Sequence, residues 1–279
     1  MFGDLEMQIE FAKRHKFLID NLPNLKVLAD IALSDCDKST FNTMTLYTLA
    51  RVAMEDDFWS IIILCSNGYA LSAKQILRGM FERVVTLSYL AKHPDEIDLF
   101  NDFFTIDQYK RVQNYERREP GEFSRKVVEE TKQRFEEVKD KYTITDCRKC
   151  KTKRLNHMWS KKNLIAMAEE LGFSVDLIDV AYYRSLEEAH PKIDALFSRT
   201  KQEGDSVSYN ERPGIEEADD TVLTAALLQL KIFEVLREYF NLKTTDRAFD
   251  NYLVGLEKYS AHARKRRESQ RQAVDSDPL

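Results

Sequence analysis

Residues that interrupt regular structure are scarce in this sequence, which has 8 Gly and 6 Pro among its 279 residues. Because these residues end strands and form turns, their scarcity argues against many short strands and favours long helices. The sequence also lacks an apolar run long enough to cross a bilayer. It lacks the basic, apolar and small-residue pattern of a signal peptide as well. We therefore expect a cytoplasmic protein with no membrane partner.

Cysteine is rare too, and neither sign of charge dominates strongly. In a cytoplasmic chain, the four Cys are expected to be reduced thiols rather than a disulfide framework. The formal net charge of −5 excludes a polycation, so contact with nucleic acid would need a local basic patch. With 43% hydrophobic and 32% charged residues, the composition is that of a globular protein with a charge-rich surface.

The clearest helical pattern covers residues 69–92, where apolar residues recur at three- and four-residue steps and predict one apolar face. Residues 41–66 before it are strongly apolar. Their β-branched run at 61–63 alone is compatible with a strand, but the polar flank at 55–57 favours a buried helix. Asn67-Gly68 is expected to stop that helix.

Towards the N-terminus we expect a helix over residues 1–20, a break at Pro23 and a shorter helix over residues 24–33. Further along, residues 122–141 are highly charged and weakly amphipathic. They are expected to project from the body or to form an exposed hairpin with the preceding helix. Residues 200–214 have the composition of a loop.

Residues 217–240 predict a long core helix with acidic residues at its N-terminus, where the helix dipole favours them. The predicted fold is therefore all-α, a bundle of long helices with a charged helical excursion. Its parts are N-terminal helices over residues 1–40, a bundle core over 41–245 with the excursion at about 96–156, and a C-terminal helix with a frayed basic tail over 246–279.

Residues 182–191 place Arg184 and His190 at the end of a predicted helix, directly before Pro191. On a straight helix, positions six apart are rotated by roughly 120°, so the two side chains would not converge. Proline, however, pushes the preceding residue out of the α region, and its ring clashes with the carbonyl of Glu187. We therefore expect the helix to end or kink at His190, which could turn the imidazole towards the guanidinium.

Together, Arg184 and His190 would suit attack by an RNA 2′-hydroxyl on the adjacent phosphate. A histidine that titrates near neutral pH can act as general base or acid, and a forked guanidinium can clamp the phosphate. This chemistry needs no metal and no cofactor. The alternative is a histidine at a helix C-terminus, with Arg184 paired to Glu187 or Glu188.

A polar stripe on the 69–92 helix includes Arg78 and Glu82, which are four apart and can pair. This helix also contributes to a resemblance. The order of several short motifs over about residues 41–240 resembles the bacterial helical family catalogued as domain of unknown function 5677. The motifs are Ala-Leu-Ser-Ala-Lys-Gln-Ile-Leu-Arg-Gly-Met-Phe-Glu at 70–82, Trp159, Leu171-Gly172, Tyr183, Ser185, His190 and the acidic-capped helix at 217–240.

The Arg-x5-His motif late in a helical bundle also resembles the HEPN superfamily. That resemblance implies a metal-independent endoribonuclease, a hydrolase of antiviral defence or a toxin–antitoxin system, which works as a homodimer with both Arg-His pairs at one interface. It implies Arg184 and His190 as the catalytic pair, with Arg78, Glu82 and Ser185 as supporting polar residues. The alternative function is a non-enzymatic helical module that binds a partner protein or RNA.

Cys147 and Cys150 have the spacing of two ligands at one edge of a tetrahedral zinc site, with His157 as a third candidate. No fourth ligand is apparent, because Cys36 and Cys65 lie far off on apolar helices. Incidental surface cysteines are the default interpretation, and we predict no metal.

Around this pair lies a run of cations that could attract a phosphate backbone, while the Trp159 and Tyr142 rings could stack on bases. The alternative is a solvated charged surface. The predicted RNA-binding residues are Arg148, Lys149, Lys151, Lys153, Arg154 and Trp159, with Lys161 and Lys162 nearby.

Overall fold

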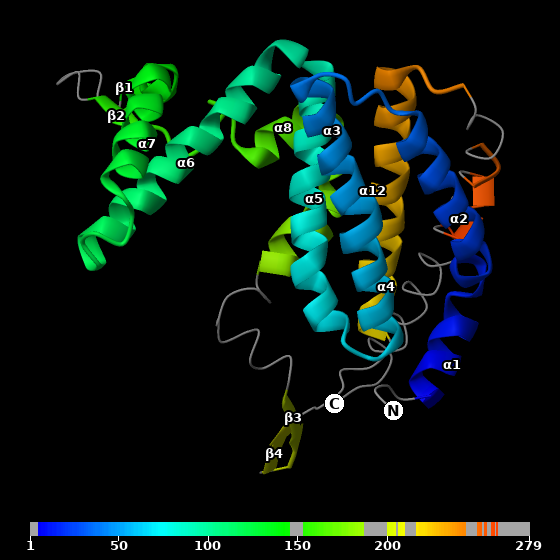
Figure 1. Cartoon of the computed structure of the whole chain (residues 1–279). Helices are drawn as coiled ribbons and strands as arrows, with labels where there is room; N and C mark the ends of the chain where they lie inside the picture. Colours follow the sequence, from blue (N-terminus) through cyan, green and yellow to red (C-terminus); the bar gives the residue numbers. More distant parts are fainter. Residues whose placement is uncertain are drawn as a thin grey trace. The chain divides into compact units, whose positions relative to one another are not determined.

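The structure is a computed structural model that describes residues 5–145, 153–186, 200–204, 206–209 and 216–243, and eight residues between 250 and 261 (250–252, 254, 255, 258, 259 and 261). The fold is all-α, as predicted (Figure 1). The chain divides into two compact units, one formed by Met1–Ala91 with Ala168–Leu279 and the other by Lys92–Met167. None of the described helices is long and apolar enough to span a membrane.

Helix α12 (Glu216–Phe240) is the centre of the first unit, where it contacts α2 (Lys16–Asp35), α4 (Phe58–Ser66) and the π-helical segments η1 (Val52–Asp57) and η4 (Asp179–Arg184) (Figure 1). It can contact so many neighbours because apolar residues face inward along its whole length. Its fully buried apolar residues are Ala218, Val222, Ala225, Ala226, Leu228, Ile232 and Leu236. The core helix expected over residues 217–240 is thus confirmed.

The apolar stretch at 41–66 is helical throughout, so the strand alternative is excluded. It comprises α3 (Phe41–Arg51), the π-helical turn η1 and α4. A capping box between Thr40 and Thr43 starts α3. The expected stop after α4 is present: Gly68 has a φ of +80° and its N–H donates to the carbonyl of Cys65. Helix α5 (Ala70–Lys92) follows.

The expected break at Pro23 is wrong. Helix α1 (Leu5–Arg14) ends just before His15, and α2 continues through Pro23 without interruption. An internal proline costs a helix about 3 kcal/mol. Here Leu18 and Leu25 are fully buried on either side of it. Since each such burial stabilises by about 1.5–3 kcal/mol, tertiary packing outweighs the local penalty.

The second unit contains the helical hairpin of α6 (Ile97–Arg118) and α7 (Arg125–Val138), so the hairpin expected for the charged segment is confirmed. The rings of Tyr109 and Phe135 stack across it with centroids 4.0 Å apart. Short 3-10 turns, η2 (Pro94–Glu96) and η3 (Lys139–Tyr142), flank the hairpin. After η3 come the antiparallel strands β1 (Thr143–Thr145) and β2 (Lys153–Leu155).

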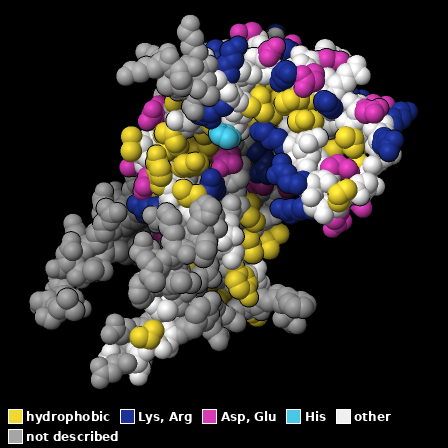
Figure 2. All heavy atoms as spheres, turned by 90° about the vertical axis from the view of Figure 1, so that its left-hand side faces the viewer, with side chains coloured by type: hydrophobic (Ala, Val, Ile, Leu, Met, Phe, Trp, Pro, Cys, Tyr) yellow, Lys and Arg dark blue, Asp and Glu magenta, His cyan; other side chains and the backbone are white. Residues whose placement is uncertain are grey.

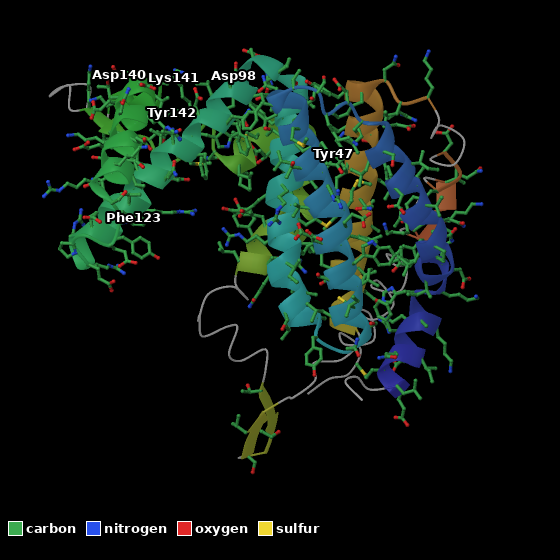
Figure 3. All side chains as sticks on the ribbon, viewed as in Figure 1. Tyr47, Asp98, Phe123, Asp140, Lys141 and Tyr142 are labelled. Carbon is green, nitrogen blue, oxygen red and sulfur yellow. The ribbon has the colours of Figure 1, made fainter. Side chains whose placement is uncertain are left out.

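Tyr142, at the end of η3 (Figure 3), cannot stack on a nucleic acid base. Its side chain is only 2% exposed, and its hydroxyl donates to the backbone carbonyl of Leu99 at 2.6 Å. Burial raises the pKa of this hydroxyl. The ring supports the hairpin from within, packing edge-on against Phe103 with centroids 5.3 Å apart.

The segment expected to be a loop at 200–214 contains a second short hairpin, β3 (Thr200–Glu203) paired with β4 (Ser206–Tyr209). Gly204, with a φ of +63°, begins its two-residue turn. The first strand, Thr-Lys-Gln-Glu, contains no apolar residue and so gave no period-two signal in the sequence. The remaining helices are α8 (Leu164–Glu170) and α9 (Val175–Ile178). Figure 2 shows cationic and anionic side chains interspersed over one face, as the mixed composition predicts.

Candidate functional site

Arg184 lies at the end of a helix that changes its winding. Ser174 caps α9 by accepting a hydrogen bond from the Leu177 N–H, and the backbone then passes into the π-helical segment η4. In this segment the backbone hydrogen bonds span five residues rather than four. Residues five apart, which diverge on an α-helix, are thereby brought onto one face.

The wider turn determines the partner of Arg184. Its Nε donates to Oδ2 of Asp179, five residues earlier, at 2.8 Å. Its Nη1 lies 3.7 Å from Oδ2 of Asp220, near the N-terminus of α12. The arginine side chain remains 48% exposed. A guanidinium that is half exposed and held by two carboxylates is oriented but still open to solvent.

His190 lies outside the described residues, and so do Glu187 and Glu188, the alternative partners considered for Arg184. The convergence of Arg184 and His190 therefore stays a prediction. The structure does establish that Asp179 and Asp220 contact the arginine. Sequence reasoning missed Asp179, because a spacing of five suggests no contact on an α-helix.

Ser185, predicted as a supporting polar residue, is completely buried. Its Oγ donates to the carbonyl of Val180 at 3.0 Å, five residues earlier. This bond accompanies the π winding at the C-terminal end of η4. Within this part of the chain, Ser185 therefore acts on the shape of the segment that carries Arg184.

Arg78 and Glu82 form the ion pair predicted from their spacing, with Nε and Oε1 2.9 Å apart. The Arg78 guanidinium also lies over the ring of Tyr182, 4.9 Å from its centroid. Phe81 on the same helix lies against that ring too. Helix α5 thus packs beside η4, and the polar stripe reaches a residue two positions from Arg184. The aromatic pair Tyr182-Tyr183 was the available sequence signal for this contact.

A second, buried charge cluster lies at the start of α12 and was not anticipated. Arg14 donates from Nε and Nη2 to the two carboxylate oxygens of Asp219, at 2.7 and 2.6 Å. Nε2 of His15 lies 3.3 Å from Oδ1 of the same carboxylate, and Nδ1 of His15 is hydrogen-bonded to the Tyr259 hydroxyl. His15 is fully buried. These contacts join the α1–α2 junction, α12 and the C-terminal segment.

Another buried carboxylate, Asp57, lies in the π-helical segment η1 and accepts a hydrogen bond from Nη1 of Arg83 at 2.6 Å. Burial raises the pKa of Asp57, and the arginine beside it opposes this effect. The pair ties η1 to α5. Each π-helical segment of the described chain therefore places a carboxylate against an arginine. In η1 the arginine is Arg83 on α5, and in η4 it is Arg184 of the same segment.

Of the predicted RNA-binding residues, Arg148, Lys149 and Lys151 lie outside the described range. Lys153 and Arg154 are exposed on β2, opposite Thr145 and Ile144 of β1. Trp159 is partly buried, and its ring packs edge-on against Phe100 with centroids 5.3 Å apart. The strand thus presents two cations, while the tryptophan contributes to packing within the same unit.

Cys147 and Cys150 also lie outside the described residues, and His157 is exposed. In the part of the chain that the structure covers, no cluster of three His, Cys, Asp or Glu could hold a metal ion. Cys36 and Cys65 are buried free thiols. Burial raises the pKa of Cys36 to about 11 and that of Cys65 to about 12, so neither is an activated nucleophile.

In a comparison with protein families, residues 57–207 match a model described as "Family of unknown function (DUF5677)". The match covers more than half of the chain and is narrower than the expected 41–240. It begins in η1 and includes α5, the second unit and η4, but not the cluster around Asp219. Comparisons with curated proteins and with solved structures give no significant match.

Proposed function

Because this chain belongs to the family of unknown function DUF5677, its family assigns it no activity, and we propose one from its residues. We propose that it is a HEPN-like cytoplasmic protein that cleaves RNA as a metal-independent endoribonuclease, with Arg184 and His190 as its catalytic pair. The observation that carries the proposal is the geometry of Arg184, whose guanidinium is oriented by Asp179 yet 48% exposed.

The contacts of Arg184 suit a group that exchanges a carboxylate for a phosphate. Exposed ion pairs contribute only about 0–1 kcal/mol, so a phosphate can replace Asp179 at little cost. Two of the guanidinium nitrogens contact carboxylates, and Nη2 has no acceptor among the described residues. The non-bridging oxygens of a phosphate can therefore be bound in the forked geometry that arginine provides.

In this mechanism His190 accepts the proton of a ribose 2′-hydroxyl, and the 2′-oxygen attacks the adjacent phosphorus. The bond from phosphorus to the 5′-oxygen breaks, which yields a 2′,3′-cyclic phosphate and a 5′-hydroxyl that takes up a proton. Arg184 stabilises the negative charge that develops on the phosphate. The Arg78–Glu82 pair, packed on Tyr182, would hold η4 in place.

Two further features of the proposal come from the HEPN resemblance. Members of that superfamily commonly place two Arg-His pairs at a dimer interface, so we propose a homodimer with RNA bound across it. A partner protein of a defence or toxin–antitoxin system would then restrain the activity. Light scattering on the purified protein measures the first of these features, and co-purification from cells that express the neighbouring genes measures the second.

Cleavage is tested by incubating the purified protein with total RNA in excess chelator. Wild type should give fragments that end in 2′,3′-cyclic phosphate, while Arg184→Ala and His190→Ala should give none. Asp179→Asn provides the matched comparison, because it removes the charge that competes for Arg184. It should preserve or increase cleavage. Intact RNA with folded wild type, or undiminished cleavage by His190→Ala, would refute the proposal.

A non-enzymatic module that binds RNA or protein is the second candidate, favoured by the exposed cations Lys153 and Arg154 on β2. Under this alternative, Lys153→Glu with Arg154→Glu should abolish RNA binding, and His190→Ala should leave it intact. Binding measured by fluorescence anisotropy at two salt concentrations separates the two candidates. Phosphate contacts weaken with salt, and loss of two cations should reduce that dependence.

A further inference from the structure

Tyr183 directly precedes Arg184 in η4 and is 49% exposed, much as the arginine side chain is at 48%. The buried side of this segment is formed by Val180 and Ala181, so the tyrosine and the arginine both belong to its solvent side. Because the Cα atoms of adjacent residues are about 3.8 Å apart, an aromatic ring and an oriented guanidinium are open to solvent next to each other.

The ring of Tyr183 is supported from inside the protein by Tyr182. The two rings meet edge-on, with centroids 5.4 Å apart and an angle of 83° between their planes. Tyr182 in turn lies against α5, with the Arg78 guanidinium 4.9 Å and the Phe81 ring 6.2 Å from its centroid. An edge-on contact covers at most one face of a ring. Since Tyr183 is half exposed, a face of its ring remains open to a ligand.

An open aromatic face beside a cation that can bind phosphate is suited to single-stranded nucleic acid. Bases of every kind stack on aromatic side chains, and basic side chains follow the phosphate backbone. One ribose joins a base to the phosphate next to it, so two neighbouring side chains can bind the two ends of a single nucleotide. In a duplex the base is stacked and paired, and it cannot reach such a ring unless it is unstacked.

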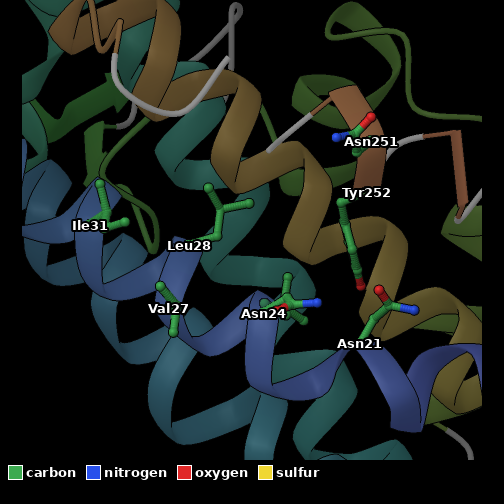
Figure 4. A pocket seen from close by; sticks show the side chains of 8 residues that line it. Asn21, Asn24, Val27, Leu28, Ile31, Asn251 and Tyr252 are labelled. Atoms are coloured by element: carbon green, nitrogen blue, oxygen red, sulfur yellow. The ribbon is translucent and has the colours of Figure 1, made fainter. Parts of the chain in front are cut away.

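The cavity beside α2 does not offer this combination (Figure 4). It has a volume of about 350 Å³ and lies between α2 and the segment around Tyr252. No lysine or arginine is among its described lining residues, so a phosphate would meet no cation on the part of the wall that the structure describes. The solvent side of η4, where Asp179 already orients Arg184, is the better match to a nucleotide.

We propose that Tyr183 stacks on an unpaired RNA base while Arg184 binds the phosphate next to that base. The inference rests on the proposed function in one respect, which is that Arg184 binds a phosphate of RNA. It goes beyond that function by assigning a base-stacking residue, which favours unpaired nucleotides over duplex at this site. Tyr183 takes no part in proton transfer, so its contribution is measured by binding.

The test is fluorescence anisotropy with a short labelled oligoadenylate, using the full chain with His190→Ala so that the RNA stays intact. In this background Tyr183→Leu removes the ring and should weaken binding about 5- to 150-fold, the range for loss of one stacked base. Tyr183→Phe keeps the aromatic face and should bind within about twofold of the parent. Tyr69→Leu is the matched control, since Tyr69 is 51% exposed but lies about 13 Å along α5 from Arg78.

Salt dependence separates stacking from a disturbance of Arg184. For a single strand, each phosphate contact adds about 0.7 to the slope of log affinity against log salt concentration. Tyr183→Leu should leave this slope unchanged, whereas Arg184→Ala should reduce it by about one contact. The same oligoadenylate annealed to oligouridylate should bind the parent and Tyr183→Leu equally, because its bases are already stacked and paired.

Three results would overturn the assignment of Tyr183. They are no binding of the single strand by folded His190→Ala protein, equal affinities of Tyr183→Leu and Tyr69→Leu, and a salt slope for Tyr183→Leu that falls as it does for Arg184→Ala. Circular dichroism measures the folding of each variant, and Tyr183→Gln replaces Tyr183→Leu if the latter unfolds.

Cleavage by wild type distinguishes this failure from a failure of the proposed function. If wild type cleaves RNA and Tyr183→Leu loses no affinity, only the stacking residue is refuted. If Tyr183→Leu loses affinity as expected and wild type leaves RNA intact, only the ribonuclease is refuted.

Discussion

Asp219 and Asp220 are neighbours in the sequence, in the first turns of α12, yet they should differ greatly in their contribution to stability. We compare Asp219→Ala with Asp220→Ala. Asp219 is 5% exposed and accepts two hydrogen bonds from Arg14, itself 17% exposed. Asp220 is 24% exposed, with an Arg184 nitrogen 3.7 Å away.

The expected difference can be estimated from these contacts. Removing one partner of a buried ion pair costs about 3–5 kcal/mol, because the other charge stays covered and loses the carboxylate that accepted its hydrogen bonds. An exposed pair contributes about 0–1 kcal/mol. Both substitutions also remove a negative charge near the N-terminus of one helix, worth about 0.3–1 kcal/mol in each, so this effect cancels in the comparison. Asp219→Ala should therefore be about 3 kcal/mol less stable than Asp220→Ala.

The assay is urea denaturation followed by far-UV circular dichroism, with both variants and wild type at one pH. A third variant, Arg14→Met with Asp219→Ala, should be more stable than Asp219→Ala alone, because it removes the charge left behind. Losses that agree within about 0.5 kcal/mol for the two single variants would refute the reasoning. The reasoning would also be refuted if the double variant, Arg14→Met with Asp219→Ala, had a lower free energy of unfolding than Asp219→Ala alone.

Three further predictions concern other buried or capping groups. Burial raises the pKa of Asp57, so this carboxyl contributes stability that is full below its ordinary pKa and is lost as pH rises through the raised one. As the pH is lowered from 7 to 4, the free energy of unfolding of wild type should therefore rise relative to that of Asp57→Asn. A difference between the two proteins that does not change with pH would contradict this. Thr40→Ala should cost about 1 kcal/mol in urea denaturation through loss of the capping box, whereas Thr48→Ala, inside α3, should cost less; equal losses would argue against the cap. Burial raises the pKa values of Cys36 and Cys65 to about 11 and 12, so both thiols should resist iodoacetamide at pH 8 until the protein unfolds. Peptide mass spectrometry measures the alkylation. Alkylation of either cysteine in the native protein would contradict its burial.

Much of the helical layout could be predicted because its signals are local. The three- and four-residue repeat of residues 69–92 predicts α5, and Gly68 marks the end of the helix before it. The Arg78–Glu82 pair follows from spacing on a single helix. Each of these depends only on residues within a turn or two of each other, which is the range over which helix periodicity and capping act.

The candidate site was less accessible from the sequence. Arg184 was selected from its residue type and its distance from a histidine, but its observed partner Asp179 is visible only once η4 is known to be π-helical.

What the sequence determined by itself is that long amphipathic helices form, where most of them begin and end, and that their apolar faces must meet. Tertiary structure alone decided that α2 runs through Pro23 and that Asp219 is buried while Asp220 is not. The physical reason is range. Backbone propensity and periodicity act over one or two helical turns, whereas burial depends on which distant face covers a residue. Burial decides how much an ion pair contributes to stability and whether packing outweighs the cost of a proline inside a helix.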